Sequence, residues 1–412
     1  MTRPDPVTPS ASDLYARYRQ AVKDQRLPLV LVDLDAVDHN IDALLAGVRA
    51  RGKTLRLASK SVRCLALIRY IVQQGQGAVR GIMAYTVEEA AFLVEQGFDD
   101  VLVAYPSVQP SDARLLARVA REGRATLAII VDAQDHLERL DAAGVAEGTR
   151  IPVVVEVDMS WRPLGGRLHF GVRRSPLRTP EAVLALAERA HSSRGLRFHG
   201  VMGYEAQIAG LGDDNPFERA ANPVKRMIRE RSRPYVEETR ERVARMIRER
   251  GLPLEVFNGG GTGSLNWCTA ESSLTEVTAG SGFLASHIFD FYRHMKLRPG
   301  AFFALQVVRR SDPGYVTCQG GGYIASGPPG PDRLPRPWLP EGLRLVGMEG
   351  AGEVQTPLRV PPGVDLDLGD PVFFRHAKAG ELAEHFNYYL LFRGDRVVDR
   401  VPTYRGMGHA FL

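Results

Sequence analysis

Short apolar runs alternate with helical patterns along most of the chain after residue 50. The runs that predict strands are 55–58, 80–84, 101–104, 126–131, 152–157, 196–202, 254–258 and 274–278. Helical patterns lie between most of them, at 62–74, 86–96, 110–121, 134–142, 180–192 and 235–250. Several runs are almost continuously apolar, as expected of strands buried on both faces. The alternation predicts a parallel sheet, and its eight repeats favour a closed (β/α)8 TIM barrel over an open sheet.

The pattern changes near residue 299, where the helical periodicity mostly stops. Apolar runs such as FFALQVVRR, DPVFFRH and YYLLF are separated by Gly, Pro and Asp, which predicts an antiparallel β domain over 299–412. Within it, SGPPGPDRLPRPWLP is predicted to be a proline-rich surface loop. The early run at 27–34 has no helix before it and is expected to pair with strands of the β domain. The chain thus divides into an N-terminal segment at 1–34, a barrel at 35–298 and the β domain.

One long insertion, at 210–233, separates the sixth predicted strand from its helix. A connection of this length is usually either functional or disordered. Two interpretations stay open, namely a lid or dimer contact over the barrel mouth and a mobile surface arm.

The composition narrows the class of protein. Of the 412 residues, 25% are charged and 44% are hydrophobic, which is ordinary for a soluble globular protein. The net charge of +5 comes mostly from scattered arginines, and no basic tract interleaved with aromatic residues indicates nucleic-acid binding. No apolar stretch long enough for a signal peptide or a membrane span is found. Three widely spaced cysteines form neither a disulfide framework nor a zinc pair, which favours a reducing cytoplasm.

A lysine follows the first predicted barrel strand, in the sequence RLASKS. Active sites of such barrels form at the carboxyl ends of the strands, so Lys60 is a candidate catalytic residue, the alternative being a solvated loop lysine. Glycine-rich loops follow the seventh and eighth strands, where backbone N–H groups and hydroxyls can converge on a phosphate, although each loop alone also fits a tight turn. The candidate phosphate-binding residues are Gly260, Gly261, Thr262, Gly263, Gly280 and Ser281. A lysine opposite a phosphate cup suits a phosphorylated aldehyde held as an imine, namely pyridoxal 5'-phosphate (PLP).

The order and spacing of several segments resemble fold-type III PLP enzymes, most closely the group of D-threonine aldolase and D-serine dehydratase, with its amino acid deaminase/aldolase relatives. The segments that carry the resemblance are LVLVDLDAVDHNI, RLASKS, GIMAYTVEEAAFLVEQGFDDVLVAYP, VEVDMSWRPLGGRLHFGVRRSP, GVMGYEAQIAG, FNGGGTGS and TEVTAGSGF. The resemblance implies a barrel of the alanine racemase N-terminal type and a Schiff base between PLP and Lys60. It also implies a cofactor contact from Tyr204, a D-configured amino acid substrate and a homodimer.

The chain departs from that family at two places. Where the family often has Arg-x-Gly-Val, this sequence has His169-Phe-Gly-Val, with Arg162, Arg173 and Arg174 nearby. The contact to the cofactor's phenolate oxygen therefore stays open, with His169 as the candidate. Where the family holds a divalent metal through His-x-Asp or His-x-Cys, this sequence has His376 followed by Lys378. Three interpretations stay open: a metal held with the help of Glu381 and His385, a metal-free site in which Lys378 or His376 meets the substrate, and a solvated helix face beside a structural histidine.

Together these features predict a PLP-dependent lyase that acts on β-hydroxy-α-amino acids by aldol cleavage, through a Schiff base on Lys60. A D-serine dehydratase or amino acid deaminase is the first alternative. A racemase shares the barrel and the lysine but needs a second base, for which the candidates are Tyr315, Tyr323, Tyr388 and Tyr389. Outside the enzymes, a PLP-binding carrier protein is disfavoured because such proteins are single barrels, and a barrel that binds no PLP is the remaining alternative.

Overall fold

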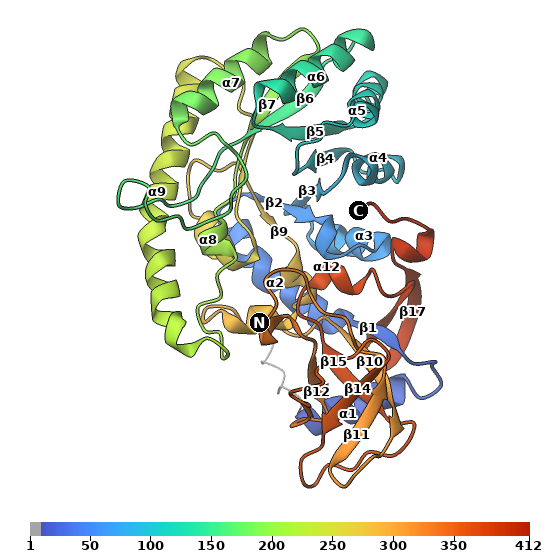
Figure 1. The fold of residues 1–412 in the computed structure, drawn as a ribbon. Helices are drawn as coiled ribbons and strands as arrows, with labels where there is room; N and C mark the ends of the chain where they lie inside the picture. Colours follow the sequence, from blue (N-terminus) through green and yellow to red (C-terminus); the bar gives the residue numbers. More distant parts are fainter. Residues whose placement is uncertain (1–9) are drawn as a thin grey trace.

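The computed structural model describes residues 10–412, which form a closed parallel barrel and an antiparallel β domain (Figure 1). The barrel strands, in chain order, are β2 (Thr54–Ala58), β3 (Val79–Ala84), β4 (Asp100–Val103), β5 (Thr126–Val131), β6 (Ile151–Glu156), β7 (Leu196–Gly203), β8 (Val256–Gly259) and β9 (Glu276–Ala279). Parallel pairing of β2 with β9 closes the ring. The predicted (β/α)8 barrel with a separate β domain is therefore confirmed.

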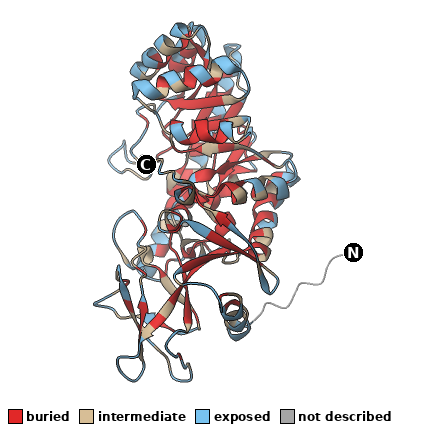
Figure 2. Ribbon diagram, turned by 90° about the vertical axis from the view of Figure 1, so that its right-hand side faces the viewer, coloured by how far each residue is buried: buried red, intermediate tan, exposed pale blue. Residues whose placement is uncertain are grey.

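Helices connect the strands and cover the outside of the barrel. They are α2 (Leu34–Ala50), α3 (Leu65–Gln74), α4 (Val87–Glu95), α5 (Pro110–Glu122), α6 (Gln134–Ala146), α7 (Pro180–Ser192), α8 (Ala206–Ala209), α9 (Asn222–Glu249), α10 (Leu265–Cys268) and α11 (Ser281–Leu284). Figure 2 shows the strands buried in red and the outer faces of the helices exposed in blue. Local signals set the helix ends. The Thr86 hydroxyl caps α4 by accepting from the N–H of Glu89, and Gly123, with φ +67°, ends α5 in the left-handed conformation.

The insertion after β7 differs from the predicted long loop, because its second half is helical. The helix α9 starts well before the predicted helix at 235–250 and runs through Pro234, although proline usually breaks a helix. The first turns of α9 are anchored to the barrel. The Arg229 guanidinium donates to the carbonyls of Leu211 (2.9 Å) and Gly263 (3.1 Å). The insertion therefore packs against the glycine loop that follows β8.

The β domain contains one sheet built mostly from the C-terminal part of the chain. Its strands are β10 (Ala301–Arg309), β11 (Tyr315–Gln319), β12 (Arg336–Leu339), β13 (Arg344–Leu345), β14 (Gln355–Arg359), β15 (Pro371–Arg375), β16 (Tyr388–Arg393) and β17 (Arg396–Pro402). The N-terminal strand β1 (Leu29–Asp33) lies in the same sheet, antiparallel to β10 and parallel to β16. All of β1 is buried, so it fills the centre of this sheet.

Contacts at the mouth of the barrel join the two domains. The N–H of His287 donates to the carbonyl of His376 (3.0 Å), and the N–H of Tyr404 donates to the carbonyl of Arg63 (2.8 Å). The Tyr404 hydroxyl also donates to the buried Glu89 carboxylate at the start of α4 (3.0 Å). These bonds hold the β domain against the carboxyl ends of the barrel strands. Among residues 10–412, no helix has the length and apolar character needed to cross a membrane.

Candidate active site

A cavity of about 930 Å³ opens at the carboxyl ends of the barrel strands. Its walls combine strand-end residues of the barrel with residues of the β domain. The polar side chains that matter below are Lys60, Tyr105, Arg174, Tyr204, Thr262, Ser281, Ser326, Arg333 and Lys378. Because (β/α)8 barrels carry out their chemistry at this face, the cavity is the candidate active site.

Lys60 lies in this cavity, on the short turn at Ser59–Ser61 that follows β2. The turn is fixed by Ser59, which is buried and donates its hydroxyl hydrogen to the carbonyl of Met83 (3.0 Å). The Lys60 ammonium donates to the Tyr105 hydroxyl (2.7 Å). The amine is therefore held in the cavity without a carboxylate partner among the described ion pairs.

The two glycine loops form one wall of the cavity, and all six residues predicted for the phosphate cup line it. The loops are tied together, because the N–H of Gly282 donates to the Thr262 hydroxyl (3.2 Å) and the hydroxyl oxygens of Ser61 and Ser281 lie 2.9 Å apart. A Cβ at Gly263 would lie 2.1 Å from a backbone carbonyl oxygen of α8, so a side chain does not fit there. The first N–H groups of the turn at Thr262–Ser264 and of α11 have no acceptor within their own turns. This wall is suited to an anion.

A buried ion pair that the sequence did not reveal supports the wall from behind. The Glu205 carboxylate accepts from the N–H of Gly260 (3.1 Å) and from the Ser264 hydroxyl, and it pairs with the fully buried Arg240. Arg240 also pairs with Glu271. Burial raises the pKa of Glu205, but the Arg240 charge and the hydrogen bonds outweigh it, so the pKa lies below its usual value. An ionised Glu205 thus fixes the backbone of the glycine loop.

The predicted contact residue Tyr204 also lines the cavity, on the segment that leaves β7. Burial raises its pKa to about 12, so the phenol stays protonated at neutral pH. The Arg174 guanidinium lies 5.7 Å from the centre of the Tyr204 ring and 5.9 Å from that of Tyr105. His169 is not among the residues that line the cavity, so the structure brings Arg174 to the site where the sequence had offered His169. The segment carrying His169 forms a bridge between Trp161 and Phe170.

His376, a candidate catalytic residue, is buried outside the main cavity. Burial lowers its pKa to about 3, so the imidazole is neutral at physiological pH. It faces a neighbouring space of about 10 Å³ that is also lined by Glu381 and His385. Lys378 also lines this small space, but of the two candidates only Lys378 reaches the main cavity.

Lys378 lines the main cavity, opposite the barrel. Its ammonium donates to the Ser326 hydroxyl (3.0 Å), and burial lowers its pKa while the nearby Glu381 charge raises it. The segment that follows, α12 (Ala379–Leu382), packs directly on the turn that carries Lys60. A Cβ at Gly380 would lie 1.7 Å from the carbonyl oxygen of Lys60, so only glycine allows this approach. The close packing places both lysines on one cavity.

The residues around His376 do not fit a divalent metal. Both Glu381 carboxylate oxygens accept from the N–H of Ser326 (3.1 and 3.0 Å), and His385 packs on the Tyr323 ring with centroids 4.8 Å apart. Lys378 stands where the second ligand of the family's pair would be, and a charged ammonium offers no lone pair. Across residues 10–412 no group of three His, Cys, Asp or Glu side chains is arranged to hold a metal ion.

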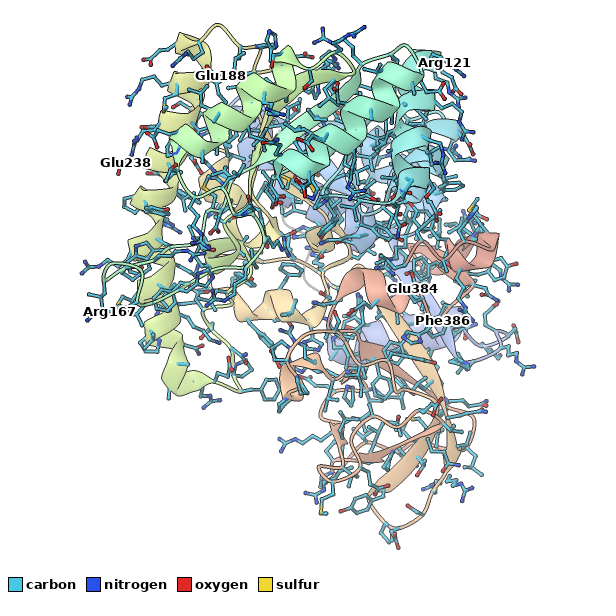
Figure 3. All side chains as sticks on the ribbon, turned by 45° about the horizontal axis from the view of Figure 1, so that its top comes forward. Arg121, Arg167, Glu188, Glu238, Glu384 and Phe386 are labelled. Atoms are coloured by element: carbon cyan, nitrogen blue, oxygen red, sulfur yellow. The ribbon has the colours of Figure 1, made fainter. Side chains whose placement is uncertain are left out.

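The proline-rich stretch after β11 contributes to the site, although the sequence predicted only a surface loop. Its residues Ser326 and Arg333 line the cavity. The sequence offered no signal for this, because proline-rich composition predicts exposure and the approach to the barrel depends on tertiary packing. Figure 3 shows the border between the domains, where Glu384 and Phe386 lie beside α12, whereas Arg167 lies at the outer edge near α9.

Comparisons with known proteins agree with this architecture. The family described as "Alanine racemase, N-terminal domain" matches residues 32–285, so the chain belongs to that family. D-threonine aldolase from Arthrobacter sp is 30% identical over 254 residues, which are 62% of this chain and 60% of that protein. 3-hydroxy-D-aspartate aldolase from Paracoccus denitrificans (strain Pd 1222) is 27% identical over 254 residues, 62% of this chain and 59% of that protein. The matched segment thus spans about three fifths of each relative, and the predicted kinship with the D-threonine aldolase group is confirmed.

Solved structures share the fold over nearly the whole chain. D-threonine aldolase from Filomicrobium marinum superposes with a TM-score of 0.75 at 22% identity, covering 92% of this chain and 95% of that one. D-threo-3-hydroxyaspartate dehydratase from Delftia sp. HT23 superposes with a TM-score of 0.72 at 21% identity, covering 93% and 98%. Both contain the barrel together with the β domain, so the two-domain arrangement is that of these proteins.

Proposed function

We propose that the protein is a PLP-dependent lyase that cleaves β-hydroxy-α-amino acids by an aldol reaction. The observation that carries this proposal is that the Lys60 amine and two glycine loops face the same cavity. Similarity to the aldolases from Arthrobacter and Paracoccus supports the reaction class. We include a D-configured substrate in the proposal because these two relatives are a D-threonine aldolase and a 3-hydroxy-D-aspartate aldolase.

The residues present fit PLP. Lys60 would hold the cofactor covalently, and the loops at Gly260–Gly263 and Gly280–Ser281 would hold its phosphate. Tyr204 and Arg174 lie where they would contact its ring. When bound, PLP supplies an electron-withdrawing ring that stabilises negative charge on the carbon bonded to the amino group.

Side chains of the cavity would carry out the charge stabilisation and proton transfer that the reaction also requires. In aldol cleavage a base takes the proton of the β-hydroxyl, and the electron pair passes to the α-carbon as the Cα–Cβ bond breaks and the aldehyde forms. A cation can stabilise the transient negative charge on the β-oxygen. Lys378 is our candidate for this cation, because it lines the same cavity as Lys60 and the glycine loops. The Lys60 amine and the Tyr105 hydroxyl, 2.7 Å apart, can pass a proton between them at the other side of the substrate. We therefore place a metal-free site first.

Cofactor binding provides the direct test of this proposal. Purified protein incubated with PLP and dialysed is expected to retain about one cofactor per chain, and borohydride reduction should fix it on the peptide that contains Lys60. A protein that retains no PLP would contradict the proposal, and fixation on another lysine would contradict the role of Lys60.

Dehydration is the second candidate reaction, because the dehydratase from Delftia shares the fold at high coverage. A racemase would need a second base, usually a tyrosine from the β domain of the partner chain, and product analysis with D- and L-amino acids would detect it by inversion of the substrate. The aldolase and the dehydratase differ in which bond of the substrate is broken, so product analysis separates them.

The serine at the start of α11 offers a test of the phosphate site. Ser281→Ala is expected to raise the Kd of PLP by roughly 10-fold, the value of one hydrogen bond to a charged group. The Kd of pyridoxal, which lacks the phosphate, should not change. Comparing the changes in Kd of the two compounds controls for any general disturbance of the cavity. An equal change for both compounds would place the phosphate elsewhere.

We infer further that the chain works as a homodimer in a reducing cytoplasm. Apolar side chains of the insertion, Phe217, Val224 and Met227, are about half exposed and would suit a contact between copies, and the cysteines are free and buried. Sedimentation at working concentration is expected to give a dimer. A fully active monomer would rule out the dimer as the working form.

A further inference from the structure

The Arg333 side chain enters the cavity from a backbone that is fixed on both sides. The N–H of Arg333 donates to the carbonyl of Gly330 (2.9 Å), and its carbonyl accepts from the N–H of Ala325 (2.9 Å). The carbonyl of Leu334 accepts from Nε2 of His287 (2.9 Å). Burial lowers the pKa of His287 to about 3, so this imidazole is neutral and Nε2 carries its hydrogen. The position of Arg333 is therefore set before any ligand binds.

The guanidinium of Arg333 lacks the partners that a buried cation normally has. Its Nε and Nη1 atoms are buried and make no hydrogen bond to any described residue. Two other cations of the cavity have partners, since Arg63 pairs with Glu384 and Lys378 donates to Ser326. Buried N–H donors on a charged group are costly when unpaired, so this group is prepared for an anion. Two adjacent N–H groups of a guanidinium match the two oxygens of a carboxylate.

The Arg333 charge acts on groups of both the β domain and the barrel side of the cavity. Burial lowers the pKa of Lys378, and the charges of Arg333 and Lys60 add to that effect, so the three cations lie within electrostatic reach of one another. Burial raises the pKa of Tyr292, and Arg333 opposes it. The Tyr292 hydroxyl donates to the carbonyl of Ala209 (2.8 Å), next to the glycine loops. An anion bound to Arg333 would lie in the same cavity as Lys60 and the glycine loops.

We propose that Arg333 is the specificity-determining residue that binds a carboxylate of the amino acid substrate through its guanidinium. This inference rests on the proposed lyase function for the identity of the ligand. The carboxylate has two possible sources: the α-carboxylate shared by all amino acids, or the side-chain carboxylate of a dicarboxylic β-hydroxy amino acid. Both use the same chemistry, and substrates with one or two carboxylates distinguish them.

Binding of malate tests the proposal without requiring turnover, because malate carries a hydroxyl and carboxylates but no amine that reacts with PLP. Arg333→Met holoenzyme is expected to bind malate roughly 10- to 100-fold more weakly by calorimetry, the range for hydrogen bonds to charged groups. Arg333→Lys should restore part of the affinity. The matched control is Arg344→Met, on an exposed arginine of the same domain outside the cavity.

Kinetics then identify which carboxylate is bound. If the Arg333→Met variant has a higher KM for both D-threonine and 3-hydroxyaspartate, Arg333 binds the α-carboxylate. If its KM rises for 3-hydroxyaspartate alone, Arg333 binds the side-chain carboxylate. Unchanged malate affinity in Arg333→Met, or no malate binding by the unaltered protein, overturns the proposal. The protein could also bind malate in a way that depends on Arg333 and yet cleave neither amino acid. That result would refute the proposed lyase function but support the anion site at Arg333.

Discussion

Replacing Lys60 with alanine is expected to remove nearly all lyase turnover, a loss of at least about 10²- to 10⁴-fold, the contribution of one positioned acid–base group. The amine is the group that would attach PLP, and it stands in the cavity 2.7 Å from the Tyr105 hydroxyl. Turnover and the absorption band of the imine between PLP and Lys60 should both be lost, although the phosphate wall should still bind the cofactor reversibly.

The control for this variant is Lys296→Ala, because Lys296 is exposed and lies outside the cavity. Both variants should keep the melting temperature of the unaltered protein, since neither side chain is in the core. A Lys60→Ala protein with normal turnover would show that another residue holds the cofactor.

Replacing Lys378 with methionine is expected to lower turnover by roughly 100-fold or more, the effect of losing one group that stabilises developing charge. Methionine keeps most of the length and apolar volume of the side chain, so the contacts of α12 with the Lys60 turn should persist. The binding of PLP should be unchanged, because Lys378 is not one of the residues that would hold the cofactor or its phosphate.

Metal dependence separates this account from its main competitor. Activity is expected to survive dialysis against EDTA, because Lys378 occupies the place of a ligand and Glu381 is already bonded to the backbone of Ser326. If EDTA abolished activity and zinc restored it, Lys378 would not be the charge-stabilising group, and His376, Glu381 and His385 would be the ligands to examine.

The barrel could be predicted because its strands are buried on both faces. The run at 126–131 matches β5, and the runs at 55–58 and 101–104 differ from β2 and β4 by a single residue at one or both ends. The last two strands are shifted by about two residues towards the C-terminus relative to the predicted 254–258 and 274–278. They are short and end in glycine or alanine, where an apolar pattern carries little information.

Other features depend on tertiary contacts that no local pattern contains. The helix α1 (Ala11–Ala21) was not predicted, and it is held by Tyr18, whose ring packs on Phe302 and Phe392 of the distant sheet. The helix α9 continues through Pro234 because its first turns are anchored to the barrel.

The residues of the candidate site also fall into those that the sequence could predict and those that depend on tertiary contacts. Lys60 and the glycine loops could be predicted, because the ends of parallel strands meet at one face of a barrel. Arg333 and the Glu205–Arg240 pair could not, because segments far apart in the sequence bring them together and each arginine is one of many. His169 and Arg174 share one loop, and only the path of that loop decides which reaches the cavity.

Product analysis of purified, PLP-loaded protein with D-threonine, with and without EDTA, tests the central claim most directly. The account predicts equal amounts of glycine and acetaldehyde at a rate that EDTA does not change, and no such products from the Lys60→Ala variant. Formation of a 2-oxo acid and ammonia, or of L-threonine in place of glycine, would contradict the assignment as an aldolase.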